Sequence, residues 1–210
     1  MSRLQLLGRE NSSNVQTVLI ALHEMGLKYD RHDIGGPFGG NKTEAYLRRN
    51  PNGLIPILND GELDVWESNT ILRYLAHRYG PTPMYPDDPA ARSHVERWMD
   101  WRQTSIGFAI GPVFMGYVRT KPEDRDMPLI RAQEKKCIDY ARMLDHQLAG
   151  KSYVAGETFS FADATLGMFM HRYYVLPFET ERPDLPNLKA WVERLRARPS
   201  VKRFTEMVLT

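Results

Sequence analysis

A run of small polar residues, Asn11, Ser12, Ser13 and Asn14, stands directly before a stretch with the apolar spacing of a helix. Serine and asparagine are preferred at the cap of a helix N-terminus, so capping alone explains one of them. The same position suits an anion, because a helix N-terminus carries partial positive charge and unpaired N–H groups. A serine hydroxyl there adds a hydrogen bond of about 1.5–3 kcal/mol to a bound thiolate, which lowers the thiol pKa by roughly one to two units. The segment is therefore suited to activate a thiol that the protein itself does not supply.

The segment NPNGLIPIL, residues 50–58, places Pro56 inside an apolar run. Proline cannot donate to a strand ladder, so it belongs at a strand entry, an edge or a bulge. A trans proline that merely opens a strand is the more common state. The hairpin pattern that follows favours a cis Ile55–Pro56 bond instead. Such a bond would present the N–H and C=O of Ile55 to a short peptide ligand.

Glu67 and Ser68 precede a third polar-to-apolar transition, in the segment VWESNTILRYL. Ser68 is placed to cap the helix that follows. The N–H groups at that helix start can bind a carboxylate, and the Glu67 carboxylate can bind a nearby ammonium. The pair is thus suited to the zwitterionic end of an α-amino acid.

These three segments are separated by alternating strand and helix patterns in the first half of the chain. Strands are predicted at residues 3–7, 28–34, 55–58 and 63–66, and helices at 14–26, 43–50 and 68–80. The order βαβαββα predicts a small α/β domain with a mixed sheet. Residues 80–90 contain four prolines and read as a linker.

Beyond the linker the pattern is helical throughout. Helices are predicted at residues 91–119, 127–150, 160–176, 185–200 and 200–208. The predicted organisation is an α/β domain over residues 1–80, a linker over 81–90 and an all-helical domain over 91–210.

Composition narrows the classes of partner. The net charge of +2 and the lack of a basic run with interleaved aromatics argue against nucleic acid. No apolar stretch approaches the roughly 18 residues that span a membrane, and the N-terminus lacks a signal-peptide pattern. The single cysteine, Cys137, excludes an internal disulfide and is expected to pack in a helix. We therefore expect a cytoplasmic setting, with no membrane or nucleic-acid partner.

Together these features resemble the cytosolic glutathione transferases, in a serine-type, theta-, phi- or nu-like bacterial form. The resemblance covers nearly the whole chain and is carried by NPNGLIPIL, by LDVWESNTILRYLA and by FSFADATLG in the second half. It implies a thioredoxin-like N-terminal domain, a helical C-terminal domain, a homodimer, glutathione as co-substrate and no metal. Ser160 and Asp163 match the family's structural capping box.

The resemblance also implies roles for individual residues. Ser12 matches the serine that hydrogen-bonds the glutathione sulfur, with Asn11, Ser13 and Asn14 as rivals. The remaining glutathione contacts would come from Lys42 (glycine carboxylate), Ile55 and Pro56 (cysteinyl part), Glu67 and Ser68 (γ-glutamyl end) and Asp100 (ligand amine, from the dimer cleft). No tyrosine or cysteine occupies the segment around Ser12, which argues against tyrosine-type and cysteine-dependent mechanisms. SSNV stands where the related isomerases have SSCS, which argues against that activity.

A second substrate would lie beside the first long helix of the second domain. The candidates there are Phe108, Phe114, Met115 and Tyr117, although an aromatic stripe at helical spacing is more often core. The leading prediction is a transferase in which glutathione thiolate attacks a small, mostly apolar electrophile. The alternatives are glutathione-dependent reduction of disulfides or peroxides, and a non-enzymatic binding protein of the same fold.

Overall fold

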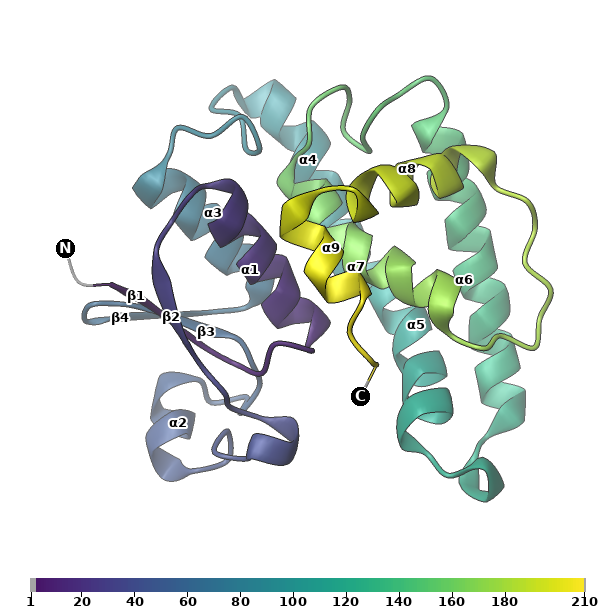
Figure 1. The fold of residues 1–210 in the computed structure, drawn as a ribbon, viewed down its shortest axis with the longest axis horizontal. Coiled ribbons are helices and arrows are strands. Elements are labelled where there is room, and N and C mark those ends of the chain that lie inside the picture. Colours follow the sequence, from purple (N-terminus) through teal and green to yellow (C-terminus); the bar gives the residue numbers. More distant parts are fainter. Residues whose placement is uncertain (1–2, 210) are drawn as a thin grey trace. The chain divides into compact units, whose positions relative to one another are not determined.

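The computed structural model describes residues 3–209, which divide into two compact units at the Tyr85–Pro86 junction. The first unit contains β1 (Leu4–Leu7), α1 (Ser13–Glu24), β2 (Tyr29–His32), the 3₁₀ turn η1 (Gly36–Phe38), α2 (Glu44–Arg49), β3 (Ile57–Asp60), β4 (Leu63–Trp66) and α3 (Ser68–Tyr79). Apart from the short turn η1, this is the predicted βαβαββα order. Figure 1 shows α1 and α3 together on one face of the sheet and α2 on the other.

The sheet is mixed, as predicted, with the strand order β2-β1-β3-β4. Strand β1 runs parallel to β2 and antiparallel to β3, and β3 and β4 form the predicted antiparallel hairpin. On the α2 face, Leu7 and Ile57 are buried with Tyr46, and Ile34 and Ile55 pack against them. This cluster packs α2 against the chain before it, at Ile34, and the chain after it, at Ile55.

The second unit is helical. It contains α4 (Pro89–Trp101), the π-helical segment η2 (Arg102–Ile106), α5 (Gly107–Phe114), the π-helical segment η3 (Met115–Arg119), η4 (Pro122–Asp124), α6 (Met127–Leu148), α7 (Phe161–Val175), α8 (Pro186–Arg196) and α9 (Pro199–Thr205). The helix α7 begins with the predicted capping box of Ser160 and Asp163. Cys137 is fully buried in α6, as expected, and burial, with Glu134 nearby, raises its thiol pKa to about 12.

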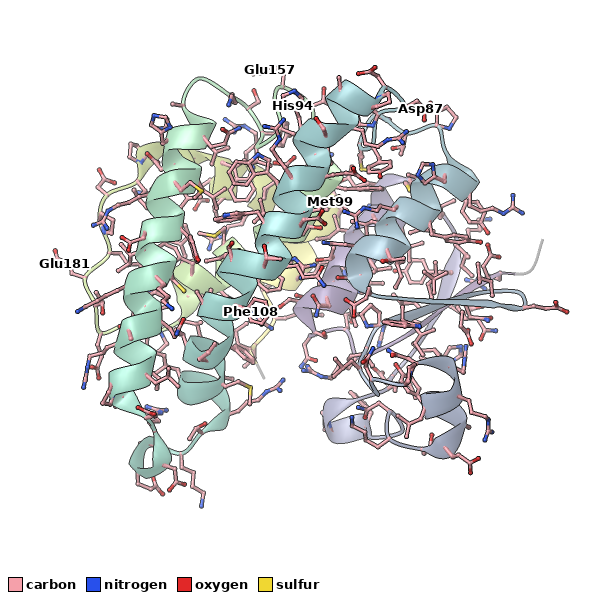
Figure 2. The ribbon with its side chains drawn as sticks, turned by 180° about the vertical axis from the view of Figure 1, so that it is seen from behind. Asp87, His94, Met99, Phe108, Glu157 and Glu181 are labelled. Carbon is pink, nitrogen blue, oxygen red and sulfur yellow. The ribbon has the colours of Figure 1, made fainter. Side chains whose placement is uncertain are left out.

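The single long helix predicted over residues 91–119 is wrong in detail. Figure 2 shows the ribbon passing from Asp87 along α4, by His94 and Met99, to Phe108, but two π-helical segments interrupt the regular α geometry. Pro112 lies inside α5 and has no N–H to bond the carbonyl four residues earlier. Widened turns accommodate such a break and often occur at functional positions.

Within residues 3–209, no helix combines the length and the apolar character needed to cross a membrane.

Candidate active site

The three polar segments meet at one end of the strands β1, β3 and β4, because these strands are paired there. Leu7, the last residue of β1, is paired with Ile57, the first residue of β3. Ile57 is in turn paired with Trp66, the last residue of β4. The turn after β1, the segment before β3 and the start of α3 therefore lie side by side. This register brings Ser12, Ile55 and Glu67 to the same end of the sheet.

Ser12 occupies the N-cap position of α1 but does not use its side chain to cap it. Its backbone is extended, with φ −85° and ψ 125°, and its hydroxyl makes no capping hydrogen bond. The main chain does the anchoring: the Ser12 N–H donates to the Arg9 carbonyl at 3.2 Å, and the Ser12 carbonyl accepts from the Gln16 N–H at 2.8 Å. The expectation that one of the four polar residues 11–14 occupies the N-cap is thus confirmed, but the Ser12 hydroxyl does not cap the helix and is left available to a ligand.

The rivals of Ser12 are placed differently. Ser13 is 4% exposed, and its hydroxyl oxygen is buried with no hydrogen-bond partner among the described residues. Asn11 accepts a hydrogen bond from the Arg9 guanidinium through its side-chain oxygen. Asn14 is half-buried in the first turn of α1. Of the two serines, Ser12 is the more accessible.

The Ile55–Pro56 bond is cis, which confirms that prediction. The chain before it is held by two residues that the sequence reasoning missed. Asn50 and Tyr46 both donate to the Leu54 carbonyl, at 2.8 and 2.7 Å. Burial raises the pKa of Tyr46 to about 12, so this phenol remains a donor at neutral pH. Asn50 follows the last residue of α2, and only its position in the NPNG segment hints at such a role.

Unlike the Leu54 carbonyl, the main-chain groups of Ile55 are not engaged in hydrogen bonds within the described part of the fold. Within residues 3–209, the N–H and C=O of Ile55 make no hydrogen bond to another backbone group outside helices and strands, and Ile55 belongs to neither. Ile55 therefore offers the unpaired main-chain groups that a strand-like peptide ligand requires.

Glu67, rather than the predicted Ser68, is the N-cap of α3. Glu67 has φ 69° and ψ 117° and is the one non-glycine residue with a positive φ between residues 3 and 209. Because β4 ends at Trp66 and α3 begins at Ser68, this single residue must turn the chain. Such a conformation is strained by about 1–3 kcal/mol and tends to occur at functional sites. Ser68, 4% exposed, is the first residue of α3.

Lys42 lies beside the segment that leads to Ile55. Its ammonium donates to the Asn52 carbonyl at 3.3 Å, and its side chain is exposed. A Cβ added to Gly53 would lie 2.7 Å from the Lys42 Nζ, so the ammonium is close to the main chain there. Asn41 donates to the Gly53 carbonyl at 2.7 Å and holds the two segments together.

The candidates of the second unit fall into two groups. Phe108, labelled in Figure 2, is 73% exposed and Met115 is 46% exposed. Asp100 is also exposed, near the end of α4. Phe108 and Met115 are seven residues apart on a helical course, which places them on a common face. They offer apolar surface to a ligand.

Phe114 and Tyr117 are instead engaged with their own unit. Phe114 is 5% exposed, with the Arg172 guanidinium 4.0 Å from its ring centroid. The Tyr117 hydroxyl donates to the buried carboxylate of Glu134 at 2.7 Å. Burial, reinforced by that hydrogen bond, raises the pKa of Tyr117 to about 12. Both residues stabilise the helical segment of α5 and η3 that carries Phe108 and Met115.

Among residues 3–209, no group of three or more His, Cys, Asp or Glu side chains is arranged to hold a metal ion.

Comparisons with known proteins identify both halves of the chain. Residues 11–78 match the N-terminal domain of glutathione S-transferases, and residues 108–199 match the C-terminal domain. Glutathione S-transferase GstB of Escherichia coli is 40% identical over 202 residues, covering 95% of this chain and 96% of its own. A probable glutathione S-transferase of rice, GSTF1, is 28% identical over 217 residues, covering 99% of this chain and 98% of its own.

Solved structures agree with these matches. The theta class glutathione S-transferase of Xanthomonas axonopodis pv. citri, solved with glutathione bound, is 41% identical, with a TM-score of 0.93 over all of both chains. Glutathione transferase F7 of Populus trichocarpa is 25% identical, with a TM-score of 0.86 over 97% of this chain and 98% of its own. The mixed four-stranded sheet with its helices, followed by a helical domain, is the fold of these enzymes. This chain belongs to the glutathione S-transferase family, enzymes that use glutathione as co-substrate.

Proposed function

We propose that this chain activates glutathione at this end of the sheet in its first unit, with Ser12 as the hydrogen-bond donor to the thiolate. The observation that carries the proposal is the Ser12 hydroxyl, which stands at the N-cap of α1 without capping it. A hydroxyl and a helix N-terminus directed to one sulfur both favour its anion. The glutathione bound to the similar Xanthomonas enzyme supports the choice of ligand.

Glutathione would be held at this end of the sheet, with separate residues for its cysteinyl, γ-glutamyl and glycine parts. The main chain of Ile55 would pair with the cysteinyl residue, in the manner of an added strand, next to Pro56. Glu67 would bind the α-ammonium of the γ-glutamyl end, and the N-terminus of α3 at Ser68 would bind its carboxylate. Lys42 would bind the glycine carboxylate. Asp100 would face the ligand amine from the cleft of a homodimer. The setting of this homodimer would be cytoplasmic.

The chemistry is displacement by the thiolate. The thiol proton passes to solvent, a sulfur–carbon bond forms to the electrophile, and the leaving group departs with its electron pair. The protein forms no covalent bond in this step, and its contribution is ionisation and positioning. Because residue 12 is serine rather than cysteine, the site lacks the nucleophile that a mixed disulfide with the protein would require. This favours conjugation over disulfide reduction.

The second substrate would be a small, mostly apolar electrophile that contacts Phe108 and Met115. These two side chains supply exposed apolar surface on one helical face, while Phe114 and Tyr117 support that face from within. The open position at Gly111 lies between them, with no atom within 4 Å of an added Cβ.

Ser12→Ala is the direct test, with Ser13→Ala as the matched control. Loss of the Ser12 hydroxyl is expected to raise the pKa of bound glutathione by roughly one to two units, while retention on immobilised glutathione changes little. Turnover of a chlorodinitrobenzene-type acceptor should fall about 10- to 100-fold at neutral pH, and Ser13→Ala should leave the pKa unchanged. A pH–rate profile of Ser12→Ala identical to that of the wild type would remove Ser12 from the mechanism. Faster turnover of a mixed disulfide than of the aromatic acceptor would favour reduction.

A further inference from the structure

Arg9 is a nearly buried cation in the turn that carries Ser12. Its residue is 7% exposed. Its N–H donates to the Ile34 carbonyl at 3.0 Å, and its own carbonyl accepts from the Ser12 N–H at 3.2 Å. The main chain of Arg9 thus joins the segment after β2 to the start of α1, and Arg9 and Ser12 belong to one tight turn.

The side chain of Arg9 is packed within the first unit rather than extended to solvent. Its guanidinium donates to the side-chain oxygen of Asn11, the residue next to Ser12. On its other side it lies against Gly36, where an added Cβ would come within 2.8 Å of the Arg9 Nε. Gly36 has φ 58°, so both its conformation and its lack of a side chain favour glycine. The turn η1 therefore closes over the guanidinium.

We propose that Arg9 is an electrostatic positioning residue for the bound thiolate, acting with Ser12 and through Asn11. The inference rests on the proposed function, because it needs the glutathione sulfur at Ser12. The fixed charge of Arg9 stabilises an anion at the mouth of the turn. Its hydrogen bond to the Asn11 side-chain oxygen fixes the side chain of the residue next to Ser12.

Arg9 is the most buried of the three cations Arg9, Arg31 and Lys42. Arg31, at the end of β2, is paired with Asp33, so these two charges offset each other. Glu10 follows Arg9 in the chain, and its negative charge opposes that of Arg9, so the net effect on the sulfur is only part of what an unopposed charge would give. Lys42 lies at the segment before Ile55 and is exposed, where solvent screens it. An opposite charge a few ångströms from an acid typically lowers its pKa by one to three units.

The test is the pKa of glutathione bound to Arg9→Gln and Arg9→Lys, followed by the ultraviolet absorbance of the thiolate. Arg9→Gln should raise this pKa by about one unit, which at a pH below the pKa is an approximately tenfold loss of thiolate. Arg9→Lys keeps the charge and should stay close to the wild type. Arg48→Gln is the charge control, since Arg48 is 66% exposed in its side chain and paired with Glu44 on α2. It should leave the pKa unchanged.

A second pair of variants tests the inference without removing the arginine. Gly36→Ala pushes a methyl group against the guanidinium, whereas Gly39→Ala, at φ 62°, meets nothing within 4 Å. Both glycines have a positive φ, so both substitutions strain the backbone, but only Gly36→Ala places a methyl group against the guanidinium. Only Gly36→Ala should therefore raise the pKa of the bound thiol. An unchanged pKa in both Arg9→Gln and Gly36→Ala would overturn the inference. If Ser12→Ala still raises the pKa in that case, the proposed function stands without Arg9; if the wild type binds no glutathione, both fall together.

Discussion

At the scale of single residues, the site combines groups that the fold uses with groups that it leaves to a ligand. The side chains of Asn50 and Tyr46 donate to the Leu54 carbonyl, whereas the Ser12 hydroxyl makes no hydrogen bond to the helix it precedes. Buried polar groups in proteins are nearly always paired, and a capping position with an unused hydroxyl is unusual. The unused hydroxyl, rather than the residue type alone, distinguishes Ser12 from an ordinary cap.

Glu67 allows binding and stability to be separated in one position. Glu67→Ala and Glu67→Gly both remove the carboxylate, so both should weaken glutathione binding about equally. Only the glycine variant relieves the positive φ of 69°. We expect Glu67→Gly to be more stable than Glu67→Ala by about 1 kcal/mol, as measured by urea unfolding.

Calorimetric titration of glutathione into both variants supplies the second measurement. Equal affinity in Glu67→Ala and the wild type would show that the carboxylate has no ligand role. Equal stability of the two variants would show that the turn between β4 and α3 relaxes without glycine.

At the scale of elements, the sequence predicted the order of strands and helices because each has a strong local signal. Gly26 ends α1, a two-residue turn at Gly61 and Glu62 joins β3 to β4, and the apolar spacing indicates the helices. The register that pairs Leu7, Ile57 and Trp66 has no local signal, since it depends on contacts between strands distant in the chain. The sequence therefore predicted the three polar segments separately, and their meeting followed only from the family resemblance.

Two local details escaped prediction for the same reason. Nothing in the residues around Glu67 signals a positive φ, which arises because β4 and α3 leave one residue for the turn. Arg9 was not singled out, because an arginine after a strand is usually exposed and its burial depends on Gly36, 27 positions later. The cis Ile55–Pro56 bond and the capping box of α7 were predicted, since both are encoded by neighbouring residues.

Glu134 shows how three segments of the helical unit are joined by one buried carboxylate. Glu134 accepts hydrogen bonds from the Tyr117 hydroxyl and from the hydroxyl and N–H of Thr180, and so joins α6, η3 and the segment after α7. Burial acts to raise its pKa, but the hydrogen bonds from Thr180 and Tyr117 outweigh burial and hold the pKa below its usual value. The charged form is therefore the stable one in the folded protein.

This direction sets the pH dependence of stability. Because the folded-state pKa of Glu134 is depressed, its contribution is present above the unfolded-state pKa of about 4.3 and is lost as the pH falls through the folded-state value. Glu134→Gln should thus destabilise the protein by about 1–3 kcal/mol at pH 7, and the difference from the wild type should shrink below about pH 4. Urea unfolding at several pH values measures it, and a difference that does not change with pH would show that the charge is unimportant.

At the scale of the whole molecule, the proposed chemistry is divided between the two units. Every proposed glutathione contact except Asp100 lies in residues 1–85, and both proposed electrophile contacts lie in residues 86–210. The glutathione groups are mainly charges and main-chain dipoles, whereas Phe108 and Met115 offer apolar surface. Substitutions in one unit should therefore alter the kinetics of one substrate.

Phe108 and Phe114 provide the matched pair for that expectation. Phe108 is 73% exposed, so Phe108→Ala should leave stability within about 0.5 kcal/mol of the wild type. It should raise the KM for an apolar electrophile and leave the KM for glutathione unchanged. Phe114 is 5% exposed, so Phe114→Ala should instead destabilise the protein by about 3–5 kcal/mol. Two-substrate kinetics and thermal unfolding separate the two, and a Phe108→Ala enzyme that loses affinity for glutathione alone would show that the division of substrates between the units is wrong.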